Sequence, residues 1–188
     1  MALTQAQKTA LMNDVAADTA FASLPHNGDG AYAVAAAYNQ LAAPDFLVWN
    51  TAVNPQAVFD AIDWSKFTPS DAADGTAIFT NRILAIQTKQ MNLQNMLIGR
   101  DIIDASKANI RSGLRDAVIQ LPSGAGGALV TAGGSSGVNV LSACTRKATR
   151  AEKLLSTGTA TTGTVTAALL GFEGYLNPQE VSQAIGWQ

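Results

Sequence analysis

The sequence predicts a mainly α protein, a helical bundle of about four to six helices with a small β-hairpin or an extended C-terminal arm. Three observations predict this fold class. Apolar residues recur at helical spacing through the middle of the chain, capping patterns precede several segments, and Ala supplies much of the 47% hydrophobic share while aromatics make up 6%. A chain of 188 residues is long enough for one ordinary domain with a closely packed core.

The first third carries start and stop signals for short helices. A capping-box pattern at Thr4-Gln5-Ala6-Gln7 predicts a helix that ends before Pro25. An Ala-rich stretch predicts a second helix at 31–41. Asn54-Pro55, a cap followed by proline at the first helical position, begins a third. Between the second and third helices, the apolar run 46–49 is a strand or a buried extended segment.

The centre, residues 75–121, predicts two consecutive helices broken at Gly99-Arg100-Asp101, and we expect the rest of the chain to pack around them. One apolar stripe marks the buried face of the first helix: Phe79, Ile83, Ile86, Leu93 and Leu97. Its other faces are rich in side-chain amides, which can hydrogen-bond to a partner without the desolvation cost of a charge. We therefore predict subunit contacts at Gln87, Gln90 and Gln94.

Two basic faces follow. The second central helix has a buried stripe of Ile110, Leu114, Val118 and Leu121. On another of its faces, at spacings of four, lie Lys107, Arg111 and Arg115. A further helix, at about 138–155, carries four basic residues on its outside: Arg146, Lys147, Arg150 and Lys153. These Lys and Arg side chains are candidates for contact with DNA phosphates or with acidic protein surfaces, or they form an ordinary solvated face.

The C-terminal region predicts a linker and an arm. Residues 156–164, a Gly/Thr repeat, contain no core-forming residue and predict a linker. Segments 165–170 and 172–176 would pair as a hairpin around Gly171 or Gly174, or lie extended against a neighbouring copy. Further candidate subunit contacts are therefore Val165, Leu169, Phe172 and Tyr175.

The domain organisation follows from these elements. We expect a helical core domain over residues 1–155, with a flexible Gly- and Ser-rich loop at 122–137. Residues 156–188 would then hold the linker, the hairpin or arm, and a short capped helix that begins at Asn177 and ends at Gly186.

Residues for catalysis or cofactor binding are scarce. The single histidine, His26, lies in a Gly-bearing turn, and the single cysteine, Cys144, lies among small apolar residues, so neither has a neighbouring base. The two are too few for a zinc site. The Gly-rich stretch lacks the Gly-Lys-Ser/Thr ending of a phosphate-binding loop. We predict no enzyme activity, no metal and no cofactor, and, because the uncharged stretches are rich in Gly, Ser and Thr, no membrane span.

Charge is unevenly distributed along the chain. Residues 1–75 contain eight Asp and two Lys, a net charge of −6, whereas residues 76–155 contain ten Lys or Arg and four Asp or Glu, a net charge of +6. Head-to-tail contacts between copies would use such a separation, and so would a fold that pairs its own two halves. Both interpretations stay open at this point.

Several stretches, about two thirds of the chain, resemble a group of small proteins encoded among the structural genes of tailed bacteriophages. The similarity is carried by residues 108–117 (ANIRSGLRDA) and 148–159 (ATRAEKLLSTGT), by the Asp63-Trp64 turn, by the Leu97 to Arg100 region, and by Gly171-Phe172-Glu173-Gly174 followed by Val181. The resemblance implies a virion structural protein, assembled in the bacterial host cytoplasm.

Among such proteins, tail-tube subunits and many decoration proteins are rich in β-strands, whereas adaptors beneath a portal ring are helical. Within that setting, the predicted helical content, the separated charge and the extendable C-terminal third favour a ring-forming head-to-tail connector that contacts copies of itself and the portal, tail or neck proteins. The alternatives are a DNA-contacting protein that uses the basic helix faces, and a capsid cement or decoration protein.

Overall fold

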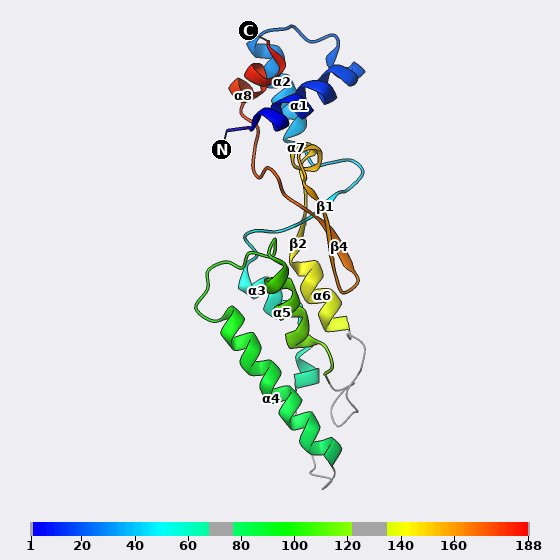
Figure 1. Cartoon of the computed structure of the whole chain (residues 1–188), viewed down its shortest axis with the longest axis vertical. Helices are drawn as coiled ribbons and strands as arrows, with labels where there is room; N and C mark the ends of the chain where they lie inside the picture. The colour runs from blue at the N-terminus through cyan, green and yellow to red at the C-terminus, as the bar shows by residue number, and fades with distance from the viewer. Residues whose placement is uncertain (1, 68–76, 122–134, 188) are drawn as a thin grey trace. The chain divides into compact units, whose positions relative to one another are not determined.

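The structure, a computed structural model, describes residues 2–67, 77–121 and 135–187 (Figure 1). In these ranges the helices are α1 (Gln5–Ala17), α2 (Gly28–Tyr38), α3 (Pro55–Asp60), α4 (Ala77–Leu97), α5 (Ala108–Val118), α6 (Ser135–Ala143), α7 (Arg150–Leu154) and α8 (Pro178–Ile185), with 3-10 turns η1 (Thr19–Phe21) and η2 (Trp64–Phe67). The strands are β1 (Leu47–Trp49), β2 (Thr145–Lys147), β3 (Gly158–Thr162) and β4 (Val165–Leu169).

A mixed sheet accompanies the helices, so the prediction of a mainly α bundle was wrong. The strand order is β2-β1-β4-β3, and β1 runs parallel to β4 with Val48 opposite Ala168. The strands are three to five residues long. β1 and β4 fall within the segments 46–49 and 165–170, where the sequence allowed a strand, whereas β2 and β3 were expected to be a helix and a linker.

The predicted helix at 138–155 is three elements. α6 ends at Ala143, β2 follows, and α7 begins only at Arg150. Thr149 starts α7 with a capping box: its hydroxyl accepts from the Glu152 amide at 3.2 Å, and the Glu152 carboxylate accepts from the Thr149 amide at 3.0 Å. The cap supplies acceptors for exposed N–H groups at the helix start, which favours a new helix over continuation of the old one.

The hairpin also lies elsewhere than predicted. It joins β3 to β4 through Gly163, whose φ of +60° suits glycine, so the expected linker supplies one of its strands. The Thr residues of β3 favour extended backbone, and Thr161 bonds across to Thr166 at 2.8 Å.

Residues 170–177 are held against helices rather than extended as an arm. The Gln7 side chain donates to the Gly171 carbonyl at 2.7 Å, and the Gly174 amide donates to the Glu152 carboxylate at 3.2 Å. The Asn39 side-chain oxygen accepts from the Leu176 amide at 2.7 Å. These bonds hold the segment around Phe172 in place, and the Phe172 side chain is buried.

The chain divides into two compact units, and the division falls within the strands. Unit 1 comprises residues 1–48, 147–159 and 168–188. In it α8 packs on α1 and α2, as Figure 1 shows. Its core includes Leu11, Val34, Tyr38 and Val181, all fully buried. The capping boxes predicted at Thr4 and Asn177 begin α1 and α8 as expected.

Unit 2 comprises residues 49–146 and 160–167. α4 packs on α5, α5 on α6, and α3 on α6. Buried side chains of these helices include Leu93 of α4, Leu114 of α5 and Leu141 of α6. The two predicted central helices are thus present, although the break between them runs from Ile98 to Lys107. Of the predicted loop at 122–137, residues 122–134 lie outside the described residues.

Within the described ranges, none of the helices combines the length and the apolar character that crossing a membrane would require.

Two glycines at the start of α2 give a matched test of unit 1 packing. A Cβ at Gly30 would lie 1.9 Å from the Pro25 carbonyl oxygen and 3.0 Å from the Trp187 ring, whereas a Cβ at Gly28 would meet nothing within 4 Å. We expect Gly30→Ala to lower the free energy of unfolding by about 1–3 kcal/mol. Gly28→Ala should leave it unchanged or raise it by up to about 1 kcal/mol. Equal effects in thermal or urea unfolding would contradict this packing.

Candidate functional site

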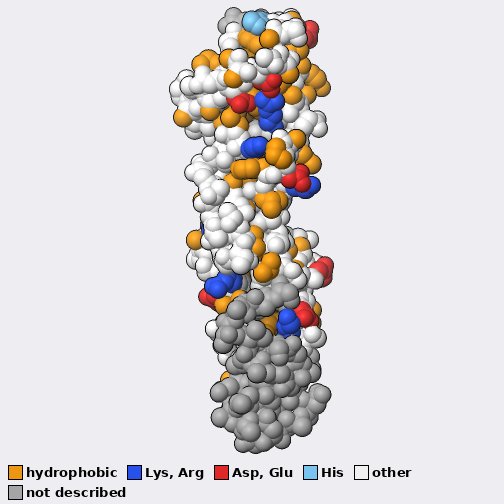
Figure 2. Space-filling view, turned by 90° about the vertical axis from the view of Figure 1, so that its right-hand side faces the viewer, with side chains coloured by type: hydrophobic (Ala, Val, Ile, Leu, Met, Phe, Trp, Pro, Cys, Tyr) orange, Lys and Arg blue, Asp and Glu red, His pale blue; other side chains and the backbone are white. Residues whose placement is uncertain are grey.

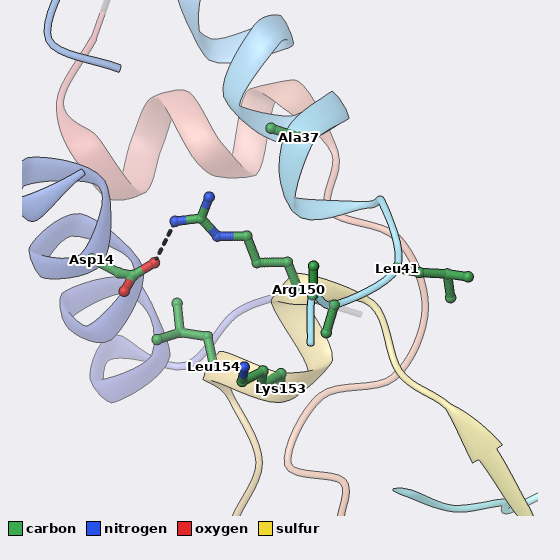
Figure 3. A pocket seen from close by; sticks show the side chains of 8 residues that line it. Asp14, Ala37, Leu41, Arg150, Lys153 and Leu154 are labelled. Carbon is green, nitrogen blue, oxygen red and sulfur yellow. Dashed lines mark hydrogen bonds and ion pairs between the residues drawn. The ribbon is translucent and has the colours of Figure 1, made fainter. Parts of the chain in front are cut away.

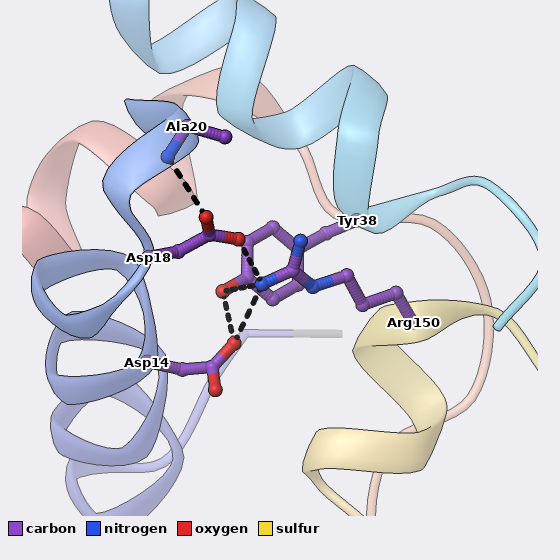
Figure 4. Close-up of polar contacts among 5 residues, drawn as sticks. All are labelled: Asp14, Asp18, Ala20, Tyr38 and Arg150. Atoms are coloured by element: carbon purple, nitrogen blue, oxygen red, sulfur yellow. Dashed lines mark hydrogen bonds and ion pairs between the residues drawn. The ribbon is translucent and has the colours of Figure 1, made fainter. Parts of the chain in front are cut away.

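The most connected polar cluster of unit 1 surrounds Arg150, at the start of α7 (Figure 4). Its Nη2 donates to the carboxylates of Asp14 at 3.1 Å and Asp18 at 2.8 Å, and lies 3.3 Å from the Tyr38 hydroxyl. That hydroxyl donates to Asp14 in turn. The guanidinium also stands over the Tyr38 ring, 4.4 Å from its centroid, and 5.3 Å from that of Phe21. One side chain therefore ties α7 to α1 and α2.

The titration of the cluster follows from these contacts. Burial and the hydrogen bond to Asp14 raise the pKa of Tyr38. The hydrogen bond from the Ala20 amide, followed by the one from Arg150, holds the pKa of Asp18 below its ordinary value of 3.8. Burial alone would lower the pKa of Arg150, but the bonds to Asp18 and Asp14 raise it. Asp18 and Arg150 are therefore ionised at neutral pH, whereas the Tyr38 hydroxyl keeps its proton.

A groove of about 410 Å³ lies beside the cluster, where Figure 3 shows Asp14 and Arg150 facing each other. Its other lining residues are Ala37, Leu41, Ala42, Ala43, Lys153 and Leu154. The Lys153 ammonium lies 5.8 Å from the centre of the Phe46 ring. Because Arg150 is already bonded to two carboxylates, it is a poor anchor for an incoming anion. The cluster is a structural tie between helices.

In unit 2, Arg111 connects several segments as Arg150 does in unit 1. Arg111 is buried, with 3% of its surface exposed. Its Nη1 donates to the carbonyl oxygens of Ala105 at 2.8 Å and Ser106 at 2.6 Å, and its Nε donates to the Thr162 hydroxyl at 3.1 Å. The guanidinium lies 4.7 Å from the centre of the Trp49 ring. Burial lowers the pKa of Arg111.

The structure therefore does not support an exposed basic line along α5. Arg111 faces inward, Lys107 pairs with Asp104 at 3.4 Å, and Arg115 lies 3.5 Å from Asp116. On the face drawn in Figure 2, Lys and Arg side chains form small separate groups, and Asp or Glu side chains lie beside most of them.

The second predicted basic face is also engaged within the chain. Lys147 pairs with Asp45 at 2.7 Å, Arg150 pairs with two carboxylates, and Arg146 is half-buried and has a partner of its own. Asp14, Asp18 and Asp45 belong to the acidic first third of the sequence. The charge separation along the chain is thus used at least partly to pair its own segments, as one of the two interpretations expected.

α4 presents a different kind of surface. Its predicted amides at Gln87, Gln90 and Gln94 are exposed, as expected. Between and beside them lie three large apolar side chains that the sequence reasoning missed. Leu84 is 56% exposed, Met91 60% and Ile98, just after the helix, 67%. Their spacing of seven residues is the signal that would have found them. We call Leu84, Gln87, Met91, Gln94 and Ile98 the α4 face.

The α4 face ends beside a small aromatic groove. Gln90, Leu93, Gln94 and Ile98 line it together with Phe59 and Trp64, whose rings stack at 5.1 Å between centroids. The groove has a volume of about 260 Å³. An uncharged apolar surface that continues into an aromatic groove suits a protein partner better than a small charged ligand.

The other predicted subunit contacts are placed less favourably. Val165 and Leu169 are half-buried in β4, and Phe172 is part of the unit 1 core. Only Tyr175 of these four is open, with 77% of its surface exposed.

Neither the single cysteine nor the single histidine lies in a setting that would make it reactive. Cys144 is buried, and burial raises its pKa to about 11, so its thiol is protonated at neutral pH. His26 stacks on Trp187 with 4.5 Å between ring centroids. In the described ranges, no three His, Cys, Asp or Glu side chains converge to hold a metal ion.

No known protein family, curated protein or solved structure matches the chain.

Arg150 makes stability depend on pH in a defined direction. We expect Arg150→Gln to lower the free energy of unfolding by about 1 kcal/mol at neutral pH, a modest loss because the pairs are partly exposed. The pKa of Asp18 is depressed in the folded state, so its share is fully present above its ordinary value of 3.8 and is lost as pH falls through the folded pKa. The gap between wild type and variant should therefore narrow below about pH 4.

The control for that series is Lys147→Gln, which removes an exposed pair and should change stability by less than about 0.5 kcal/mol. Urea unfolding at several pH values measures both variants. A gap that widened on acidification would contradict the role given to Arg150.

Arg111 should behave as a core residue rather than a surface charge. We expect Arg111→Met to lower the free energy of unfolding by about 2–4 kcal/mol, because buried carbonyl oxygens would lose their donor. Lys107→Met, at a side chain 65% exposed, should cost less than about 0.5 kcal/mol. Similar costs for the two variants in chemical unfolding would show that Arg111 does not hold unit 2 together.

Proposed function

We propose that the chain is a non-enzymatic structural subunit of a tailed-phage virion, a head-to-tail connector that works as a ring of copies between the portal and the tail. The observation that carries the proposal is the α4 face, where three large apolar side chains stand exposed with amides beside them. A folded chain that leaves such a surface open is suited to bury it against another protein.

The use of charge points the same way. Lys107, Lys147 and Arg150 each pair with a carboxylate of the same chain, and Arg111 is buried. Contacts with DNA phosphates require Lys and Arg side chains that can replace the counterions bound to the DNA. Basic groups that already pair with Asp are poorly suited to binding phosphate. The described residues therefore favour binding of a protein through the uncharged α4 face over binding of DNA.

The resemblance of residues 108–117 and 148–159 to tailed-phage structural proteins supplies the setting of the proposal. A connector works only as an assembly, since it joins two larger structures around an axis. Uncharged apolar surface suits lasting contacts of that kind, because obligate interfaces are more hydrophobic than transient ones.

Assembly is the property that tests the proposal. We expect the purified protein to form oligomers whose mass in sedimentation rises with concentration, and to bind its portal, because only association buries the α4 face. Added salt should preserve or strengthen the association, whereas DNA binding would weaken steeply in a salt series.

Electron micrographs of the portal complex would locate the subunits. A protein that stays monomeric at high concentration and does not bind the portal contradicts the proposal, as would binding to mature head shells in place of the portal.

A further inference from the structure

α4 carries two apolar stripes on opposite sides. Ile86, Leu93 and Leu97 are almost fully buried and face the core of unit 2. Seven residues span about 20° less than two full turns of an α-helix, so Leu84, Met91 and Ile98 stay on one side. That side lies roughly opposite Ile86 and Leu93, which follow Leu84 and Met91 by two residues, or about 200°. One stripe makes the fold, and the other is left to solvent.

The exposed stripe has the spacing of a helix–helix seam. Apolar residues every seven positions keep one helix in contact with another along its length, as in coiled coils. From Leu84 to Ile98 the stripe is about 21 Å long at 1.5 Å per residue, which is roughly four helical turns. A helix of similar length is therefore the partner that the spacing fits.

The residues beside the stripe indicate which helix would be the partner. Gln87, Thr88, Gln94 and Asn95 border it, and all four are uncharged and exposed. Of the described α4 side chains, Lys89 alone is charged, and it is turned toward α5, where its ammonium donates to the Asp116 carbonyl. A partner with a charged seam would gain nothing here. An identical stripe meets no like charge, and each amide can both donate and accept.

We propose that α4 of one copy packs antiparallel against α4 of a second copy, about a two-fold axis at Met91. The proposal rests on the proposed function, in that it names the surface through which copies meet. The antiparallel arrangement sets opposite ends of the two helix dipoles beside each other, which parallel pairing does not. A two-fold contact uses the same patch on both subunits.

The pairing that follows is complementary at every level of the seam. Met91 faces Met91 of the second copy, and Leu84 faces Ile98 of the second copy. At the flanks, Gln87 faces Gln94 of the second copy and Thr88 faces Asn95 of the second copy, so that polar groups meet hydrogen-bonding partners. Such a contact closes at two copies, and a ring would be built from these pairs through other surfaces.

Single cysteines on the seam test the pairing and its direction. Wild type is the control, because its own Cys144 is buried. We expect Met91→Cys to form a disulfide-linked dimer on mild oxidation, since the two residues meet at the axis. Leu84→Cys alone should remain unlinked, while an equimolar mixture of Leu84→Cys and Ile98→Cys should cross-link. Linkage of Leu84→Cys to itself, or none in Met91→Cys, would overturn the antiparallel pair.

A charge at the axis gives an independent measurement. Met91→Glu should raise the dissociation constant of the pair by at least about tenfold, because two carboxylates would face each other. Tyr32→Glu is the matched control, an exposed apolar residue of α2 outside the α4 face, and it should leave the constant unchanged. Equal effects of the two variants would overturn the proposal.

The results also separate the two proposals. Oligomers that form without cross-linking at Met91 contradict the α4 pair and leave the connector function standing. A chain that is monomeric throughout and does not bind the portal contradicts both.

Discussion

Arg111 places a positive charge inside unit 2, and much of that unit is arranged to satisfy it. A buried guanidinium needs acceptors for its N–H groups, and here they come from the 105–106 turn and from Thr162 of β3. Trp49 covers the flat face of the cation and donates its own Nε1–H to the Ala160 carbonyl at 3.0 Å. The start of α5, the end of β1 and the outer strand β3 are thereby fixed through one side chain.

The pairing of charged side chains within the chain also explains why the α4 face is uncharged. Arg150 does for α1, α2 and α7 what Arg111 does for unit 2, and Lys147 is matched by Asp45. Many charged side chains pair with one another inside the chain, whereas the exposed side chains of the α4 face are leucine, methionine, isoleucine and amides. Specificity on such a surface comes from shape and from the placement of hydrogen-bonding groups rather than from long-range attraction.

Local signals in the sequence predicted local structure well. The caps at Thr4, Asn54 and Asn177 begin helices because a cap and the amides it satisfies lie within three residues. The sheet was missed because β1 pairs with β4 far along the chain, and the inward turn of Arg111 because Trp49 and Thr162 are distant in sequence. The second stripe of α4 was in principle readable, since its spacing of seven needs no tertiary contact.

The interleaving of the two units has a consequence for synthesis on the ribosome. α1 and α2 emerge first, yet the helix that covers both, α8, comes from the far end of the chain. Unit 1 also needs residues 147–159 and 168–188, so its first 48 residues must wait with Leu11 and Val34 uncovered while most of the protein is made. Apolar faces of α1 and α2 thus stay uncovered through most of translation, and they are buried only when the end of the chain is made.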